Sequence, residues 1–328
     1  MTTASLCPWR MQVHHLQQES AYTWTISLIN HDFYCWQAGQ FALVKIGSSG
    51  QLRAYTLSST PGQSEFITLT VRHIEGGTGS SWLTQSVHPG DTLWLSDPQG
   101  SFTCESHPSE RYLFLAAGCG ITPMMSMCRW LKANRPTCNV QLFYSVRSRD
   151  AVIFAEALAT MTPWLDLHIS EENRPSAELP DGRITQAYLQ QRVPDIADRT
   201  VMICGPKGYM DQVKEYAANL GAEKIFLENF VPVASQRPEG QAETFKMGSA
   251  QSPGEAEFRY GETLLEAMEN NQIAIETACR TGVCGCCKTQ VLSGRYTTQS
   301  QQTLSEAEQQ AGYVLACSCY PASDIVIA

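Results

Sequence analysis

The chain reads Cys279-Arg-Thr-Gly-Val-Cys284-Gly-Cys286-Cys287 in its last quarter, and this stretch decides the fold there. Cys279, Cys284 and Cys287 have the spacing C-x4-C-x2-C, and a fourth cysteine, Cys317, follows after a long gap. Four thiolates with this spacing are typical of a [2Fe–2S] cluster, because soft, anionic sulfur suits iron in either oxidation state. We therefore predict that these four cysteines are the ligands of such a cluster.

A structural zinc site is the alternative for these cysteines. Zinc sites favour paired C-x2-C units or histidine partners, whereas the gaps here are four and two residues and no histidine lies near the loop. Cys286 and Cys319 fit no ligand position, so we expect them to pack beside the ligands. Residues Ala278–Cys287 and Tyr313–Pro321 resemble a plant-type ferredoxin domain, which implies an α+β, β-grasp-like fold.

Composition and charge exclude several classes of protein. The chain has 328 residues, which is long enough for two or three folded domains. Its hydrophobic share of 43% excludes disorder throughout the chain. A net charge of −9 argues against nucleic acid as a partner, because such proteins need a basic face. No window holds the ~18 uninterrupted apolar residues of a membrane helix, and the first residues lack the pattern of a secretory signal. We therefore expect a cytoplasmic protein without a membrane partner.

Residues 9 to about 105 contain short β-branched, aromatic or alternating runs separated by turn signals such as Pro61-Gly62 and Pro89-Gly90. Closely spaced runs of this kind predict an antiparallel barrel or sandwich. The expected strands are Trp24–Ile29, Gln40–Ile46, Arg53–Ser58, Glu65–His73 and Asp91–Leu95.

After Pro108 strands alternate with helices, which predicts a parallel, doubly wound α/β sheet. The expected strands are Tyr112–Ala117, Val140–Val146, Leu165–Ser170, Val201–Cys204 and Lys224–Leu227. The expected helices are Pro123–Asn134, Ile153–Met161, Thr185–Gln191 and Gly208–Leu220. From about Pro232 the composition shifts to Pro, Gly, Gln, Ser and Glu, which is typical of a linker.

The stretch Arg53-Ala-Tyr55-Thr56-Leu-Ser58-Ser59 contains side chains that suit a flavin. A cation can pair with a pyrophosphate, an aromatic ring can stack on an isoalloxazine, and a hydroxyl can bond the reactive flavin nitrogen. The stretch resembles the R-x-Y-[ST]-x-[ST] motif of the ferredoxin–NADP reductase superfamily. This resemblance implies a flavin-binding β-barrel and gives these roles to Arg53, Tyr55 and Thr56, with Ser58 as the second hydroxyl. Without a ligand, they would be a surface arginine beside a core tyrosine.

A glycine-rich turn, Gly76-Gly77-Thr78-Gly79-Ser80-Ser81-Trp82-Leu83, enters a predicted helix. Such a turn exposes backbone amides that suit a phosphate, although it can also be an ordinary turn. It resembles the G-x-x-S-x-x-L segment of the same superfamily. We expect Gly77, Gly79, Ser80 and Ser81 to bind the flavin nucleotide. The resemblance implies FAD, with FMN used in a related branch.

A second turn, Gly118-Cys119-Gly120-Ile121-Thr122-Pro123, follows a predicted strand and opens a helix. It lacks the third glycine of the G-x-G-x-x-G dinucleotide fingerprint, but it resembles the superfamily's G-x-G-x-[TA]-P turn. Gly118 and Gly120 allow close approach to a phosphate or ribose, and the resemblance places Thr122 at the nicotinamide end. The alternative is a tight turn without a ligand.

Four further residues complete the predicted nicotinamide site. Cys204 and Gly205 end the fourth strand, where open α/β sheets bind ligands, and the resemblance places Cys204 near the reacting nicotinamide carbon. Glu228 matches the superfamily's carboxylate near the flavin, and Arg147 matches its contact to the adenosine ribose and phosphates. Alternatively, Cys204 is a buried small residue and Glu228 a solvated strand end. The predicted catalytic residues are Tyr55, Thr56, Cys204 and Glu228. We expect NADH as the donor, because the Ser/Tyr cluster of NADP-binding relatives is absent.

The resulting domain order is an FAD-binding domain over 1–106, an NAD-binding domain over 107–231, a linker over 232–243 and a ferredoxin domain over 244–328. A flavin accepts a hydride and releases single electrons, whereas a [2Fe–2S] cluster carries one electron at a time. This order predicts an NADH-dependent oxidoreductase in which electrons pass from NADH to FAD, then to the cluster and to an external acceptor.

The acceptor is suggested by three stretches, Trp9–His15, Ala116–Gly120 and Gly312–Cys319. They resemble the reductases of hybrid-cluster protein, which implies that protein as partner and its reduction of hydroxylamine or nitric oxide. Three alternatives stay open: the reductase component of a Rieske oxygenase or another monooxygenase, a redox sensor that uses Cys286 and Cys319, and a zinc-binding interaction protein. Residues 255–328 carry nine acidic and four basic side chains, which indicates either docking on a basic acceptor or a solvated face.

Overall fold

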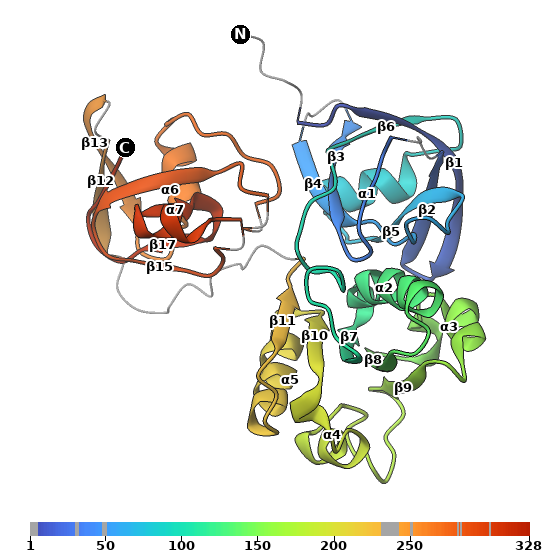
Figure 1. Ribbon diagram of the computed structural model, residues 1–328. Helices are drawn as coiled ribbons and strands as arrows, with labels where there is room; N and C mark the ends of the chain where they lie inside the picture. Colours follow the sequence, from blue (N-terminus) through green and yellow to red (C-terminus); the bar gives the residue numbers. More distant parts are fainter. Residues whose placement is uncertain are drawn as a thin grey trace. The chain divides into compact units, whose positions relative to one another are not determined.

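The computed structural model describes residues 6–29, 33–47, 51–230, 243–249, 252–280, 282, 284–301 and 303–328. These residues divide into two units, Met1–Phe230 and Val231–Ala328 (Figure 1). In the described ranges, no helix is long and apolar enough to cross a membrane.

The first unit begins with a six-stranded antiparallel β-barrel. Its strands are β1 (Trp9–Ser20), β2 (Thr23–Ile29), β3 (Phe41–Ile46), β4 (Gln51–Thr56), β5 (Phe66–Arg72) and β6 (Thr92–Leu95), in the order β4-β3-β6-β1-β2-β5. The two edge strands meet where Leu57 pairs with Leu69 and the Ser58 amide donates to the Thr68 carbonyl at 2.9 Å. Helix α1 (Thr78–Gln85) packs on β3, β4 and β5. The predicted barrel is therefore confirmed.

The predicted strands do not include β1, because the hydrophobic alternation in its sequence is weak. Its buried side chains near the start, Met11 and Val13, are followed by a polar run in which most residues are exposed or half-buried. β1 nevertheless pairs with both β2 and β6, so it lies in the middle of the sheet order. Pairing on both sides stabilises a strand whose own hydrophobic alternation is weak.

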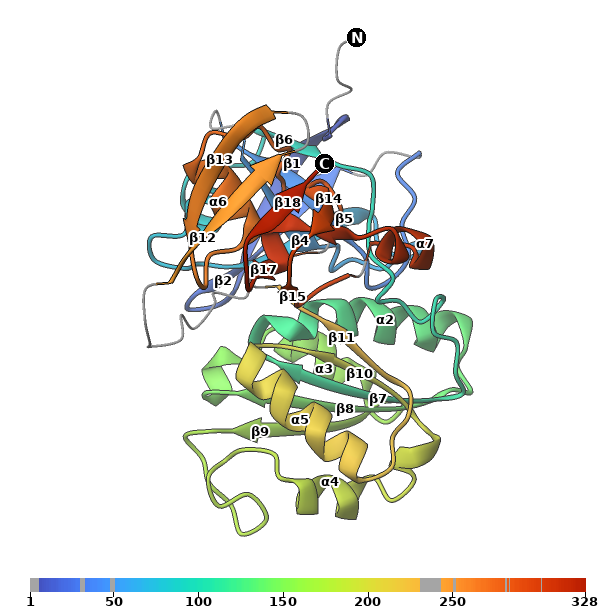
Figure 2. The same ribbon diagram turned by 90° about the vertical axis from the view of Figure 1, so that its left-hand side faces the viewer.

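The second part of the first unit is a five-stranded parallel sheet with helices on both faces (Figure 2). Its strands are β7 (Arg111–Ala117), β8 (Asn139–Val146), β9 (Asp166–Glu171), β10 (Thr200–Cys204) and β11 (Ile225–Glu228), in the order β11-β10-β7-β8-β9. Its helices are α2 (Ile121–Asn134), α3 (Ala155–Met161), α4 (Gln186–Arg192) and α5 (Lys207–Asn219), with short 3-10 helices at η2 (Gly118–Gly120), η3 (Arg149–Ala151) and η4 (Ile196–Asp198). All predicted strands and helices of this region are present.

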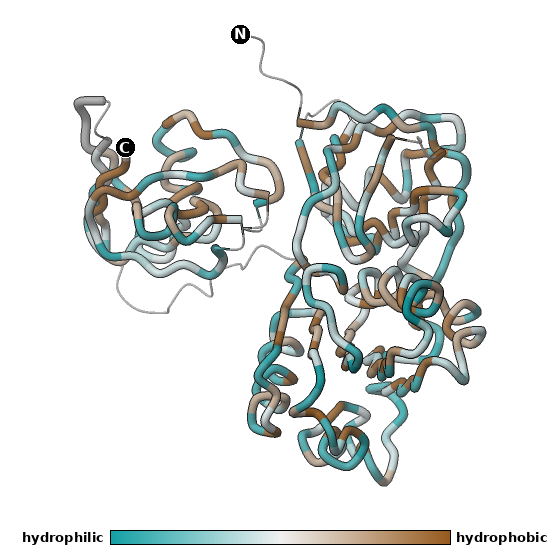
Figure 3. Tube along the Cα trace, viewed as in Figure 1, coloured by the Kyte–Doolittle hydropathy of each residue, from teal (hydrophilic) through white to brown (hydrophobic). Residues whose placement is uncertain are grey.

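Each face of this sheet has its own core, because side chains alternate along the strands. On β7, Tyr112, Phe114 and Ala116 pack with α2 and α3, whereas Leu113 and Leu115 pack with α4 and α5. Hydrophobic stretches accordingly follow the strands of the sheet (Figure 3). The strands leave polar residues and glycines at their carboxyl ends, where ligands bind in such sheets.

The barrel and the parallel sheet are in direct contact within the first unit. Ser126 Oγ on α2 donates to the Ser59 carbonyl at 2.6 Å. Ala38 and Phe102 of the barrel region belong to the same hydrophobic cluster as α2 and α3. These contacts fix the residues that follow β4 against the sheet.

The second unit is a mixed sheet packed on a helix, as expected for an α+β fold. Strands β12 (Thr244–Ser249), β13 (Ser252–Arg259), β14 (Lys288–Ser293), β16 (Tyr313–Leu315) and β18 (Ile325–Ile327) have the order β13-β12-β18-β14-β16, and β15 (Tyr296–Thr298) pairs with β17 (Cys319–Pro321). The helices are α6 (Leu264–Asn270), α7 (Glu306–Gln310) and the 3-10 helix η5 (Ala316–Ser318). α6 begins at Leu264, because Thr263 and Glu266 form a capping box. The predicted linker lies outside the described residues except for Glu243.

Candidate functional site

Arg53 and Tyr55 project from the same face of β4 toward the start of α1. A Cβ atom on Gly79 would lie 2.9 Å from both Arg53 Cγ and Tyr55 Oη, so only glycine fits between them. Burial raises the pKa of Tyr55 to about 12, which keeps its hydroxyl protonated at physiological pH. Arg53 donates to the Leu52 carbonyl and to Gln51 Oε1, and within the described ranges it forms no ion pair with a carboxylate.

The glycine-rich turn leaves the first amides of α1 available. Gly77 precedes α1 without a side-chain hydrogen bond to those amides. Instead Ser80 Oγ contacts the Ile74 amide and the Gly77 carbonyl, and Ser81 Oγ donates to the Ile74 carbonyl, so both hydroxyls fix the turn. The amides of Gly79 and Ser80 have no helical carbonyl partner and lie at the start of α1 close to the Arg53 side chain, so they suit an anion such as a pyrophosphate.

Thr56 and Ser58 are both buried, but Ser58 is used inside the barrel. Its hydroxyl lies 2.8 Å from Thr68 Oγ1 and 2.8 Å from Thr70 Oγ1, and its amide helps to close the barrel. These contacts account for the burial of its hydroxyl, whereas its contact with a flavin stays a prediction.

The predicted nicotinamide residues lie at the carboxyl ends of β7, β8, β10 and β11. A Cβ atom on Gly120 would lie 2.0 Å from the Cys204 carbonyl oxygen, so the turn and the end of β10 are in close contact. Thr122 Oγ1 donates to the Cys119 carbonyl at 2.9 Å and holds the turn. Cys204 pairs in register with Glu228 on β11, and both are buried. Burial raises the pKa of the Cys204 thiol well above its usual value, so it stays protonated.

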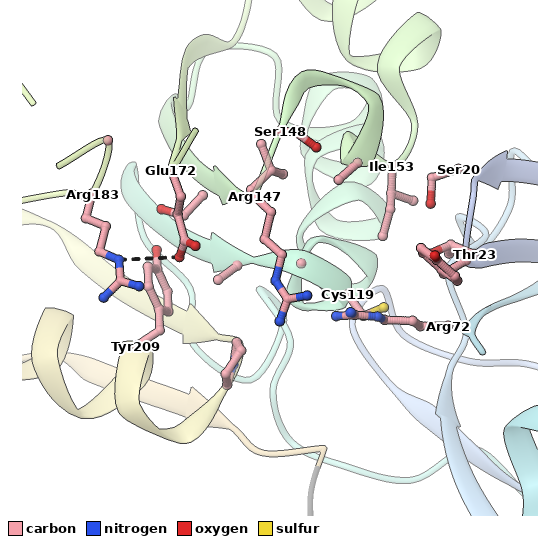
Figure 4. Close-up of a pocket in the computed structure, with 18 of the residues that line it drawn as sticks. Ser20, Thr23, Arg72, Cys119, Arg147, Ser148, Ile153, Glu172, Arg183 and Tyr209 are labelled. Carbon is pink, nitrogen blue, oxygen red and sulfur yellow. Dashed lines mark ion pairs between the residues drawn. The ribbon is translucent and has the colours of Figure 1, made fainter. Parts of the chain in front are cut away.

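A cavity of about 720 Å³ opens beside these strand ends (Figure 4). Of the predicted residues, Gly118 and Arg147 line it, whereas Thr122, Cys204 and Glu228 do not. The barrel contributes Ser20–Thr23 and Arg72 to its wall, so both parts of the first unit form it.

Arg72 is a lining residue that the sequence did not reveal. It ends β5, its side chain extends toward that of Arg147, and Cys119 lies against it (Figure 4). Arg183 pairs with Glu172 at 3.4 Å, but Arg72 and Arg147 have no carboxylate partner within the described part of the chain. Two free guanidinium groups facing one cavity suit the phosphates of a dinucleotide. The available signal in the sequence was a single arginine near the end of a predicted strand, four residues before Gly76.

The second unit brings the four predicted cluster ligands together. Cys287 Sγ lies 3.3 Å from Cys317 Sγ, and the thiol of Cys284 interacts with that of Cys279. Among the described residues, no group of three or more Cys, His, Asp or Glu side chains has the spacing of one metal ion's ligands. Cys279 also interacts with Cys317, so the four thiols form one continuous group, as expected of four ligands shared by two irons.

Backbone amides of the loop point at these sulfurs. The Gly282 amide donates to Cys317 Sγ at 3.2 Å, and the Cys317 amide donates to Cys287 Sγ at 3.5 Å. Such bonds stabilise anionic sulfur, so the donor set fits a [2Fe–2S] cluster. Cys319 is fully buried in the core, as expected for a packing residue, and Cys286 is half-buried beside Cys284.

Comparisons with known proteins agree with this arrangement. Residues 26–104 match the oxidoreductase FAD-binding domain, residues 114–215 the oxidoreductase NAD-binding domain and residues 249–322 the 2Fe-2S iron-sulfur cluster binding domain. The chain is 51% identical to NADH oxidoreductase HCR of Escherichia coli (strain K12), over 98% of each chain. The chain belongs to this family of NADH oxidoreductases. Its cofactors are therefore FAD, NADH and a [2Fe–2S] cluster, as predicted.

More distant relatives of the NADH oxidoreductase share its three-part organisation. The glycine betaine monooxygenase reductase subunit of Chromohalobacter salexigens is 28% identical and covers 90% of this chain and 87% of its own. The solved phthalate dioxygenase reductase has a TM-score of 0.68 and 21% identity, with 97% of each chain covered, and shows the same fold. The match to the 2Fe-2S cluster binding domain shows that the zinc alternative is wrong. A role as the reductase component of an oxygenase system remains the alternative, with less support.

Proposed function

We propose that this NADH oxidoreductase delivers its electrons to hybrid-cluster protein, which reduces hydroxylamine or nitric oxide. The observation that carries this proposal is the 51% identity to NADH oxidoreductase HCR over 98% of each chain. The similarity to oxygenase reductases is about half as strong and carries the second candidate, a Rieske oxygenase or monooxygenase as acceptor. We place the protein in the cytoplasm, because all thirteen cysteines are free of disulfides, as in reducing compartments.

The proposed flavin site is built from β4 and α1. Arg53 and the amides of Gly79 and Ser80 would bind the pyrophosphate, with Gly77 and Ser81, whose own amides donate to the Ile74 and Gly77 carbonyls, shaping the turn around the nucleotide. Tyr55 and Thr56 would contact the isoalloxazine, with Ser58 behind them. The flavin, when bound, accepts two electrons as hydride and releases them singly. Because Tyr55 stays protonated, it can donate a hydrogen bond and adds no negative charge to the site.

The proposed nicotinamide site is built from the strand ends of the parallel sheet. Gly118, Gly120, Thr122 and Gly205 would allow close approach of the nucleotide, and Arg147 would bind its phosphates. Cys204 and Glu228 would lie at the nicotinamide end. Since burial keeps the Cys204 thiol protonated, it can pack against a nicotinamide without attacking it. Cys279, Cys284, Cys287 and Cys317 would hold the cluster.

We also propose the domain bounds 1–106, 107–231 and 244–328, joined by a linker over 232–243. The matched ranges of the three family models fall within these domains, which supports the division. The unit boundary after Phe230 lies beside the proposed start of the linker.

The acceptor is tested by anaerobic NADH consumption with purified hybrid-cluster protein and hydroxylamine. A Rieske oxygenase component serves as the competing acceptor at the same concentration. We expect rapid turnover with hybrid-cluster protein and slow turnover with the oxygenase component. The reverse preference would overturn the proposed partner and leave the flavin, nicotinamide and cluster assignments intact.

Removing either free guanidinium of the cavity should weaken NADH binding. A hydrogen bond from arginine to a phosphate contributes about 1.5–3 kcal/mol, so Arg72→Ala and Arg147→Ala should each raise the Kd for NAD⁺, which carries the same phosphates as NADH, by about ten- to a hundredfold. Arg149→Ala is the matched control, because its guanidinium is 70% exposed and lies 4.0 Å from Glu171. Kd is measured by titration calorimetry with NAD⁺. Equal affinities in all three variants would contradict the assignment of this cavity.

A further inference from the structure

Glu19 lies near the end of β1, where hydroxyl groups inside the barrel hold its carboxylate. Its Oε1 accepts a hydrogen bond from Thr25 Oγ1 at 2.7 Å, and Thr25 Oγ1 lies 2.9 Å from Thr70 Oγ1. Thr70 Oγ1 in turn lies 2.8 Å from the hydroxyl of Ser58, two residues beyond Thr56. The three hydroxyl-bearing residues are buried, so this chain fixes one side of the carboxylate.

The other side of the Glu19 carboxylate contacts the parallel-sheet part of the unit. Its Oε2 accepts a hydrogen bond from the backbone amide of Phe154 at 3.4 Å. Phe154 has a left-handed backbone (φ 61°), which a bulky residue adopts only where its surroundings hold it. The Arg129 guanidinium on α2 lies 5.6 Å from the centre of the Phe154 ring. Burial lowers the pKa of Arg129, and the Glu19 carboxylate opposes that shift by attraction.

The segment that Glu19 contacts forms part of the cavity wall. Ala151 and Ile153 line the cavity, and the Ile153 amide donates to Tyr144 Oη at 3.3 Å. Tyr144 donates in turn to the Gly118 carbonyl at 3.1 Å, which connects this segment to the glycine turn. Residues Ser20–Thr23, directly after Glu19, line the same cavity, and Ser20 and Thr23 lie near Ile153 (Figure 4). Both walls of this end of the cavity therefore meet at Glu19.

We propose that Glu19 is a positioning residue for NADH, which joins the barrel to residues 151–154 and so sets the shape of the nucleotide cavity. The hydrogen-bonded hydroxyls of Thr25, Thr70 and Ser58 also connect Glu19, and with it the cavity wall, to the end of β4 that carries Tyr55 and Thr56. The inference rests on the proposed binding of NADH in this cavity, and it is independent of the electron acceptor.

The test compares Glu19→Ala and Glu19→Gln in the FAD- and cluster-loaded full chain. The first measurement is hydrogen–deuterium exchange of a peptide covering residues 150–154 without nucleotide, and the second is the Kd for NAD⁺. The third is the rate of flavin reduction by NADH in a stopped-flow experiment. We expect faster exchange in Glu19→Ala, a Kd raised about tenfold and slower flavin reduction, because a charged hydrogen bond is lost. Glu19→Gln keeps an acceptor oxygen and should show a smaller change of each quantity.

Two further variants control the experiment. Glu65→Gln removes an exposed carboxylate from the same barrel and should leave all three measurements unchanged. Thr25→Val breaks the hydroxyl chain without touching Phe154, and it should accelerate exchange over 150–154 even if Glu19→Ala fails to fold.

Two outcomes would overturn the inference. Unchanged exchange over 150–154, with a lower unfolding temperature alone, would show that Glu19 only stabilises the barrel. Faster exchange with unchanged NAD⁺ affinity and flavin reduction would show that the contact exists but does not position the nucleotide. In the second case the Arg147→Ala variant shows which proposal has failed. An unchanged Kd for NAD⁺ in that variant means that NADH does not bind in this cavity, whereas a raised Kd means that only the role of Glu19 is wrong.

Discussion

Replacing Cys317 with serine will remove the [2Fe–2S] cluster and leave flavin reduction by NADH intact. Cys317 contacts Cys287 through sulfur and accepts a hydrogen bond from the Gly282 amide, so its loss removes both a ligand and the target of that amide. The four proposed ligands belong to the unit Val231–Ala328, whereas the proposed flavin and nicotinamide residues belong to Met1–Phe230. Turnover with the external acceptor should fall to the background rate. Iron analysis and visible absorption measure the cluster, and stopped-flow absorption measures the flavin.

Cys286→Ser is the matched control for this prediction, because it makes the same substitution at a cysteine that lies beside the proposed ligands. Cys286 fits no position in the C-x4-C-x2-C spacing, so this variant should keep two irons per chain. A Cys317→Ser protein that retained both irons would contradict the ligand assignment. A Cys317→Ser protein that lost flavin reduction would contradict the independence of the two units.

Replacing Gly79 with valine will release FAD from the protein. A Cβ atom at this position would lie 2.9 Å from Arg53 and from the Tyr55 hydroxyl, and the valine methyl groups require still more space. Inserting atoms into a packed site costs about 1–3 kcal/mol, so the affinity for FAD should fall by roughly five- to a hundredfold. The measurement is FAD content after gel filtration, together with the Kd for added FAD.

The control for Gly79 comes from the same turn. A Cβ atom on Gly76 would meet nothing within 4 Å, and asparagine tolerates its left-handed backbone (φ 73°), so Gly76→Asn should retain FAD. If Gly79→Val bound FAD as tightly as Gly76→Asn, the proposed placement of the pyrophosphate between Arg53 and α1 would be wrong.

The sequence predicted the parallel sheet well because its signals are local. The strands Tyr112–Ala117 and Val201–Cys204 are continuous apolar runs, and each is followed by a glycine and then a helical pattern. The long strand Trp9–Ser20 escaped prediction because its exposed polar residues obscure the alternation. Its place between two neighbours is a property of the whole barrel, which a local pattern does not contain.

The candidate sites divide in the same way. Cysteine spacing and the glycine turns are contained in short stretches, so they could be predicted from the sequence. Arg72 and Glu19 act through residues far along the chain, Arg147 and Phe154 respectively. Only the packing of the barrel on the sheet brings these partners together, so no sequence motif predicts that they lie close to each other. The pairing of Cys204 with Glu228 is partly predictable from the sequence, because it follows once the strands that end at these two residues are known to be neighbours.

The burial of the cysteines determines how the protein withstands nitrosating and oxidising agents. In the unit Met1–Phe230, Cys35 is exposed and Cys119 is half-buried, while Cys7, Cys104, Cys128, Cys138 and Cys204 are buried. Burial raises the pKa of Cys128 and Cys204, and thiols that stay protonated react poorly with such agents. Within this unit, chemical damage by reactive nitrogen species should therefore begin at Cys35, on the surface, and spare the thiol beside Glu228. An oxidoreductase built this way keeps its nicotinamide site chemically intact in the environment that its proposed partner detoxifies.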